Sequence, residues 1–171
     1  MKRLALISAT FFVAFAGFQP VVVQVRDVPN SPTIPILAWD AGQADYGLRT
    51  RINREGEDIG DVRHGEHRLY LSSAFAAAHG AFDHAVAQDG KLLRNSNEAD
   101  DPDACRFDHV CSPTHTIGLG VPDEWLRKHP DSLVVTFRPH TGQNWSIRLD
   151  GSVIHAYLNT IDSVEASLKK K

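Results

Sequence analysis

An alternation of apolar and polar residues with a period of two recurs along most of this chain. Leu48, Thr50 and Ile52, for example, alternate with two arginines and an asparagine. Successive side chains of a β-strand point to opposite faces, so this pattern indicates strands with one buried face. The segments that show it are 48–53, 67–72, 82–86, 117–121, 133–137 and 145–149. Short strands separated by turn residues predict a mainly antiparallel sheet.

The period changes after residue 152. Val153, Tyr157, Ile161, Val164 and Leu168 follow one another at helical spacing, and three lysines come directly after them. Positive charge is favourable at the C-terminal end of a helix, so this segment predicts an amphipathic C-terminal helix.

One or two short helices are expected between the strands. Residues 72–79 are rich in alanine behind two serines that can cap a helix, and 124–129 follow Pro122 and Asp123. Trp145 and Tyr157 fall at positions expected in the core. The sequence therefore predicts an α+β fold, mainly antiparallel β and sandwich-like, with one or two short helices and a C-terminal helix.

The first sixteen residues have the pattern of a secretory signal peptide. Lys2 and Arg3 precede an apolar run, which ends on Ala14-Phe15-Ala16. The alternative is an uncleaved membrane anchor that extends to about Val23. We expect a signal peptide over 1–16, an extended tether over 17–35 and a single β-rich domain over 36–171. A periplasmic or secreted location follows, without a stable membrane span if the leader is cleaved.

The charge of the chain argues against nucleic acid as a partner. The formal charge is −3, and removal of Lys2 and Arg3 lowers it by two, to −5. General binding to nucleic acid requires the opposite sign. Arg49, Arg51 and Arg54 form a local basic stripe, which is either a solvated strand face or an anion contact.

Both cysteines lie in the polar segment 95–113. In an exported protein, Cys105 and Cys111 are interpreted first as a disulfide bond. With His109 and His115 they also form a possible zinc-ligand set. Four acids of the same segment suit either a solvated loop or calcium ligands. These acids are Glu98, Asp100, Asp101 and Asp103.

The chain contains no motif of nucleophilic, redox or nucleotide chemistry. It has no G-x-S-x-G elbow, no C-x-x-C pair and no phosphate-binding glycine loop. We therefore assign no catalytic residue and no cofactor, and whether the protein is an enzyme stays open. Histidines offer the alternative of a zinc or copper site. Its candidate ligands are His64, His67, His109 and His115.

Several short segments of the C-terminal half resemble a known family. They are Val121-Pro-Asp-Glu-Trp-Leu126, Ser132-Leu-Val-Val-Thr-Phe137, Ile147-Arg-Leu-Asp-Gly151 and Ala156-Tyr-Leu158, which follow a cysteine after Phe107. Their order is similar to the C-terminal part of the invasion-associated locus B proteins, small exported bacterial proteins built on a β-rich domain. The resemblance implies a role in the envelope or in host interaction, and it transfers no catalytic residue.

Two interpretations of function follow. The first is a non-enzymatic exported module that binds a protein or envelope partner. Its candidate surface comprises Asp100, Asp101, Asp103 and Trp125. The second is a periplasmic metal-binding protein or metal-dependent hydrolase that uses the four histidines named above.

Overall fold

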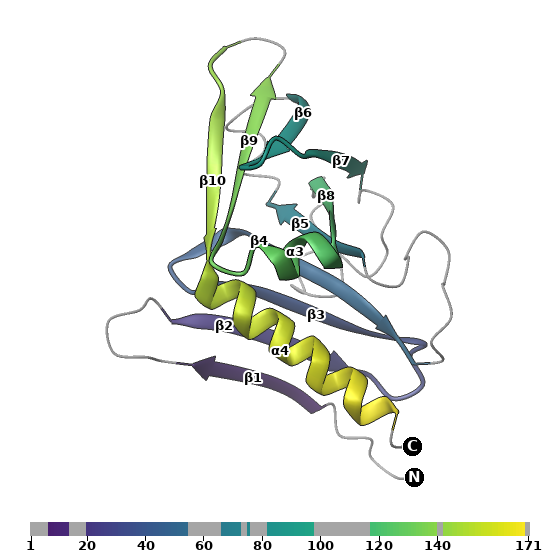
Figure 1. The fold of residues 1–171 in the computed structure, drawn as a ribbon. Coiled ribbons are helices and arrows are strands. Elements are labelled where there is room, and N and C mark those ends of the chain that lie inside the picture. Colours follow the sequence, from purple (N-terminus) through teal and green to yellow (C-terminus); the bar gives the residue numbers. More distant parts are fainter. Residues whose placement is uncertain are drawn as a thin grey trace.

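The computed structural model describes residues 7–13, 20–54, 66–72, 75, 82–97, 117–139 and 142–169. These residues form ten strands and two described helices, α3 and α4 (Figure 1). The strands are β1 (Ile7–Val13), β2 (Val21–Asp27), β3 (Thr33–Asp40), β4 (Gln43–Asn53), β5 (Glu66–Leu71), β6 (Phe82–Ala87), β7 (Leu92–Asn97), β8 (Ile117–Pro122), β9 (Ser132–Pro139) and β10 (Trp145–Asp150). The helices are α3 (Asp123–Lys128) and α4 (Gly151–Leu168).

All the strand pairs are antiparallel, in the order β1-β2-β3-β4-β5-β8-β7-β6-β9-β10. Strand β7 pairs with β8 of one sheet and with β6 of the other, so it joins the two sheets. In Figure 1, β9 and β10 run across the direction of β2 and β3. The fold class predicted from the alternation, an α+β fold of mainly antiparallel strands, is confirmed.

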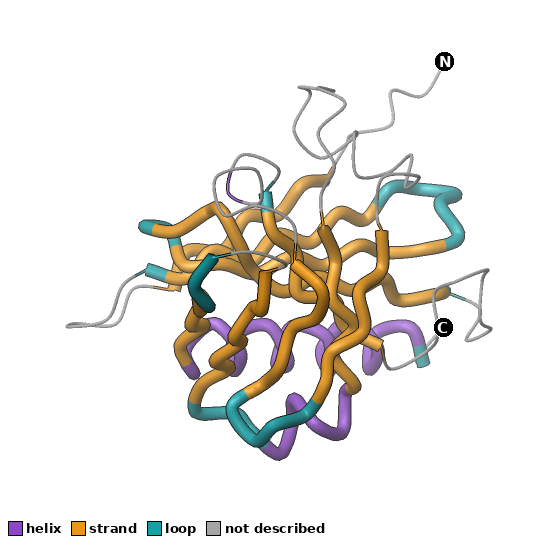
Figure 2. The backbone as a smooth tube through the Cα atoms, turned by 90° about the horizontal axis from the view of Figure 1, so that it is seen from above, coloured by secondary structure: helices purple, strands orange, loops and turns teal. Residues whose placement is uncertain are grey.

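The helix α4 covers the inner face of β2, β3 and β4, and it also contacts β9 and β10. Its buried residues are Val153, Ile154, Tyr157, Leu158 and Ile161. Three of them, Val153, Tyr157 and Ile161, belong to the predicted stripe, whereas its other two members, Val164 and Leu168, are partly buried. Both described helices lie on the same side of the strands (Figures 1 and 2). The hydrophobic core is therefore the layer between this side of the sheet and the helices.

Gly151 allows α4 to begin directly after β10. A Cβ at this position would lie 2.6 Å from the carbonyl oxygen of Asp131 and 2.9 Å from that of Pro130. Real Cβ atoms do not approach so closely, so a larger residue would push α4 away from the turn before β9. The glycine thus fixes where the helix crosses the sheet.

The short helix expected at 124–129 is confirmed as α3, which buries Trp125 and Leu126. Asp123 and Glu124 lie in its first turn and Arg127 and Lys128 in its last, as the helix dipole favours. The helix expected at 72–79 lies mostly outside the described residues.

The expectation of a tether over residues 17–35 is wrong for the part that the structure describes. Residues 21–27 form β2, and 33–35 begin β3 inside the sheet. The side chains of Val21, Val22 and Val23 are buried. Burial of this valine run and the ladder with β3 outweigh the prolines that suggested a tether.

Residues 7–13, within the expected leader, form the edge strand β1 next to β2. Cleavage of the leader stays a prediction. Among the residues that the structure describes, no helix has both the length and the apolar character needed to span a membrane.

Candidate functional site

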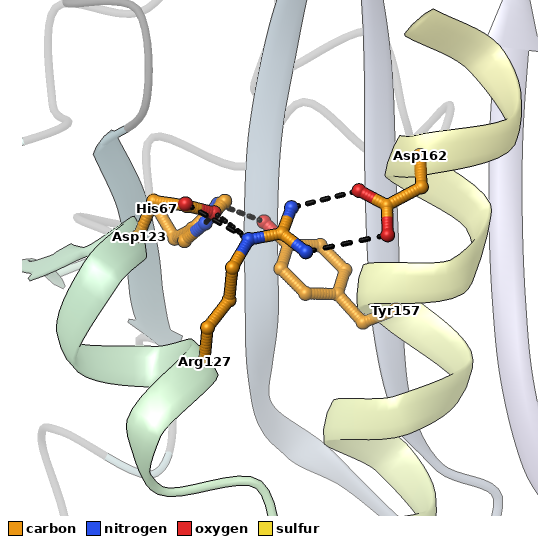
Figure 3. A network of polar contacts seen from close by, with 5 residues as sticks. All are labelled: His67, Asp123, Arg127, Tyr157 and Asp162. Carbon is orange, nitrogen blue, oxygen red and sulfur yellow. Dashed lines mark hydrogen bonds and ion pairs between the residues drawn. The ribbon is translucent and has the colours of Figure 1, made fainter. Parts of the chain in front are cut away.

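A chain of polar side chains runs through the core between β5, α3 and α4 (Figure 3). At its centre is His67 of β5, whose exposed fraction is 2%. Its Nε2 lies 2.8 Å from Oδ1 of Asp123, and its Nδ1 lies 3.2 Å from the hydroxyl oxygen of Tyr157. Both ring nitrogens of this buried histidine are therefore hydrogen-bonded.

These partners determine the tautomer of His67. A carboxylate only accepts hydrogen bonds, so Nε2 carries the proton and donates it to Asp123. Nδ1 is then the acceptor, and the phenol of Tyr157 donates to it. The three groups form one directed chain, from the Tyr157 hydroxyl through the imidazole to the carboxylate.

Arg127 extends this hydrogen-bond network to the protein surface. Its Nε donates to both carboxylate oxygens of Asp123 at 2.9 Å. Its two terminal nitrogens donate to Asp162 of α4 at 3.2 and 2.8 Å, the paired geometry that suits a guanidinium and a carboxylate (Figure 3). Arg127 therefore ties α3 to α4.

The electrostatics of the network favour a neutral imidazole between a phenol and a carboxylate. Burial lowers the pKa of His67, against the opposing effect of Asp123. Burial acts to raise the pKa of Asp123, but hydrogen bonds from His67 and Arg127 outweigh it and the net pKa is lowered. Burial raises the pKa of Tyr157 well above its usual value. The Tyr157 hydroxyl therefore keeps its proton.

The network can hold protons in place, but its central groups do not reach a substrate. Tyr157 and His67 lie within the core, and their polar side-chain atoms are hydrogen-bonded to neighbouring residues of the protein. Only the outer members, Asp123, Arg127 and Asp162, have solvent-accessible side chains. The arrangement fastens both described helices to β5.

The metal-site hypothesis loses one of its four ligands. Because both ring nitrogens of His67 are hydrogen-bonded inside the core, this residue is not available to bind a metal in this arrangement. His64, His109 and His115 lie outside the described residues. Within the described part of the chain, no three histidine, cysteine or acidic side chains converge as a metal site.

The disulfide of Cys105 and Cys111 falls outside the described residues and stays a prediction, as does the acidic surface. That surface consists of Asp100, Asp101 and Asp103, with Glu98 nearby.

The interpretation of Trp125 as an exposed anchor is wrong. Its exposed fraction is 7%, and its indole Nε1 donates to Asp89 at 2.6 Å. The ring also stacks on His129, with centroids 4.3 Å apart. Trp125 and Leu126 form the apolar face of α3. Burial of an indole is favourable once its N–H has a partner, so Trp125 packs into the core and is not presented at the surface.

The sheet face opposite α4 carries four arginines, which we call the arginine face. These are Arg26 of β2, Arg49 and Arg51 of β4, and Arg68 of β5. They alternate along their strands with the buried residues of the core face. Arg49 is only 6% exposed, so the expectation of a solvated strand face is wrong for this residue.

Arg54, the third residue of the expected basic stripe, has a different role. It pairs with Asp27 and donates from its Nε to the carbonyl oxygen of Ser31 at 2.8 Å. It therefore braces the turn between β2 and β3 and does not belong to the arginine face.

The register places like charges opposite each other on the arginine face. Arg49 pairs across the strands with Arg68, and Arg68 pairs on its other side with Gly120. Like charges directly opposite each other are destabilising on their own, and Arg49 and Arg68 each interact with other groups of the chain.

A pocket of about 250 Å³ lies where the β3–β4 turn meets β10. Burial is the main cause that raises the pKa of Tyr46, which lines it, and the nearby Asp40 and Asp150 act in the same direction. Both carboxylates are engaged, because Asp40 accepts from the backbone N–H of Gly42 and Asp150 accepts from Arg148. Both carboxylates of the pocket are thus hydrogen-bonded to other residues of the pocket lining.

Comparison of the chain with protein-family models, with curated proteins and with solved structures finds no match.

Proposed function

We propose that this protein is an exported, non-enzymatic β-rich module of the bacterial envelope that binds an acidic protein partner. The observation that carries the proposal is the arginine face, to which three strands contribute four arginines on one side of the sheet. The leader pattern and the resemblance to the invasion-associated locus B proteins support the envelope setting.

The arginine face combines positive charge with a partly buried surface. Arg26, Arg51 and Arg68 are half-buried, whereas Arg49 is nearly covered. Each of the four already interacts within the chain. In this proposal, carboxylates of the partner bind beside the contacts that these arginines already make, since a guanidinium has five N–H donors in a fork that matches a carboxylate. Guanidinium–carboxylate contacts are stronger in a partly desolvated setting than in open water.

Positive charge is the basis of recognition by the arginine face. The large apolar side chains exposed in the described part of the chain are Val28 and Leu92. The chain is acidic overall, with a formal charge of −3. A basic face on an acidic protein orients an acidic partner toward one side and repels it from the others.

The experiment measures binding of a fluorescent ten-residue polyglutamate peptide to the exported protein at low and physiological salt. The test variant carries Arg51→Glu and Arg68→Glu. The control variant carries the same charge change at exposed positions of the other sheet, Arg138→Glu and Arg148→Glu. We expect about tenfold weaker binding for the test variant and less than about twofold for the control.

Equal losses in the two variants would show that the peptide responds only to net charge, and the proposal would be wrong. Because glutamate at half-buried positions can unfold the sheet, Arg51→Gln with Arg68→Gln is measured in parallel. Circular dichroism in the near ultraviolet establishes that each variant keeps its fold. The glutamine pair should weaken binding in the same direction, by a smaller factor.

A further inference from the structure

We infer that removal of the leader opens the edge of β2, and that the partner adds an extended strand there in the place that β1 occupies. The inference deepens the proposed function and rests on it, since both require an exported protein with a partner. It assigns the partner contact to main-chain hydrogen bonding along a sheet edge, a recurring mode of peptide recognition.

The register of β1 shows how such a strand fits. Ile7 to Val13 pair with Asp27 to Val21 without a break. The expected cleavage site follows Ala16, and β2 begins at Val21. Cleavage would therefore remove the whole of β1 and leave β2 intact, as the edge strand of the sheet.

The vacated edge is well suited to accept a strand. Val21, Val22 and Val23 are buried in the complete sheet, and charge appears only at Arg26 and Asp27. Proteins usually protect a sheet edge with charged side chains, prolines or bulges. No proline or bulge interrupts the pairing of β1 with β2, and the charged residues Arg26 and Asp27 lie at one end of it.

The opposite edge of the sheet, formed by β10, is less suited to accept a strand. The edge strand β10 carries Arg148 and Asp150, both exposed and paired with each other at 3.1 Å. Charges in the middle and at the end of a short edge strand discourage further pairing. The two edges are therefore unequal, and β2 is the one that accepts a strand.

The register also defines the chemistry of the incoming strand. Val21, Val23 and Val25 lie on the core face of β2. The residues of the incoming strand that pair with them should therefore be apolar. In β1 these positions are Val13, Phe11 and Ala9. Opposite Arg26, where β1 has Ser8, an acidic residue would pair with a member of the arginine face. The partner strand is thus antiparallel to β2, apolar at alternate positions, and acidic at its N-terminal end.

The experiment uses the protein recovered after export with its own leader. Intact mass first establishes where the chain begins. The probe is a fluorescent peptide of residues 6–14 with two added C-terminal lysines for solubility. The control peptide carries Thr10→Pro and Phe11→Pro. Alternate residues of a strand donate to one neighbour, so two consecutive prolines remove at least one hydrogen bond to β2.

We expect a mass that begins at Gly17, binding of the probe, and about tenfold slower hydrogen exchange of amides in 21–27 when the probe is bound. The control peptide should bind at least about tenfold more weakly. A mass that begins at Met1 overturns the inference, because β1 then stays in place. So does equal binding of the two peptides, unchanged exchange in β2, or a dimer of the processed protein joined through β2.

The polyglutamate assay separates this inference from the proposed function. If the arginine variants weaken acid binding while the strand probe fails, only strand addition is wrong. If the strand probe protects β2 while the arginine variants bind polyglutamate like the control, the arginine face is not the site for acidic partners.

Discussion

Replacement of Tyr157 by phenylalanine tests the buried network directly. Tyr157→Phe removes one hydroxyl oxygen from a fully buried position and leaves the ring in place. The acceptor left behind is Nδ1 of His67, which lies 3.2 Å from that hydroxyl and has almost no access to water. A buried acceptor without a donor costs about 1–3 kcal/mol, so we expect the free energy of unfolding to fall by about 2 kcal/mol.

The assay is equilibrium unfolding in urea, followed by tryptophan fluorescence and far-ultraviolet circular dichroism. A loss of about 2 kcal/mol should lower the midpoint at an unchanged m-value. In a thermal scan, the same loss corresponds to a decrease in Tm of roughly 4–8 °C for a domain of this size. Coincidence of the two spectroscopic probes is required before the free energies are compared.

A double-mutant cycle provides the control. With His67→Leu in the background, the acceptor that Tyr157→Phe would leave unsatisfied is absent, so the second substitution should cost at least about 1 kcal/mol less than it does alone. Additive effects would refute the hydrogen bond as the cause. A loss below about 0.5 kcal/mol for Tyr157→Phe alone would refute the importance of the network to stability.

Three further predictions concern pH, the core and the surface. Because burial lowers the pKa of His67, the unfolded chain takes up a proton below about pH 6.5 that the folded chain does not. The free energy of unfolding, measured by urea titrations, should therefore fall as pH decreases from 6.5, and His67→Gln should reduce this slope. Gly47→Ala should cost about 2 kcal/mol in the same titration, because a Cβ there would overlap a backbone carbonyl oxygen and lie 2.8 Å from the Tyr70 hydroxyl. Asp162→Asn, which weakens an exposed pair with Arg127, should cost no more than about 0.5 kcal/mol in thermal unfolding, and a larger loss would show that this outer pair is as important as the buried part.

The elements with a strong period were predictable from sequence. Val153, Tyr157 and Ile161 recur at helical spacing, and the structure places all three in the buried stripe of α4. In β4, Leu48 and Ile52 alternate with arginines and lie on the core face as expected. In both segments the local period and the tertiary burial agree, so the local pattern was sufficient.

The beginning of the domain was not predictable in the same way. Three prolines between 28 and 35 suggested a tether, but Pro35 lies buried within β3, opposite Arg51. The run Val21 to Val23 is buried on both faces of the sheet, so it shows no alternation. A short continuous apolar run does not distinguish a strand from other buried segments, and only the pairing with β3 identifies it.

The polar network was not predictable from local patterns, because its members lie far apart in the sequence. His67 and Tyr157 are 90 residues apart, and no local pattern connects them. One signal was present, however: His67 is in phase with Leu69 and Leu71, whose side chains are fully buried. A histidine on the core face of a strand is more simply interpreted as a buried hydrogen-bonding group than as a metal ligand.

The position of α4 in the chain has a consequence for biosynthesis. All ten strands of the described residues precede α4, so a growing chain completes this sheet before it receives the helix that covers it. The sheet face that carries Leu48 and Leu69 has no helix to cover it until residues 151–161 are made, and synthesis of this segment after β10 takes on the order of a second at the usual rate. During that interval an apolar sheet face is exposed to other chains. Chaperones that hold the chain until α4 has been made should therefore increase the yield of folded protein.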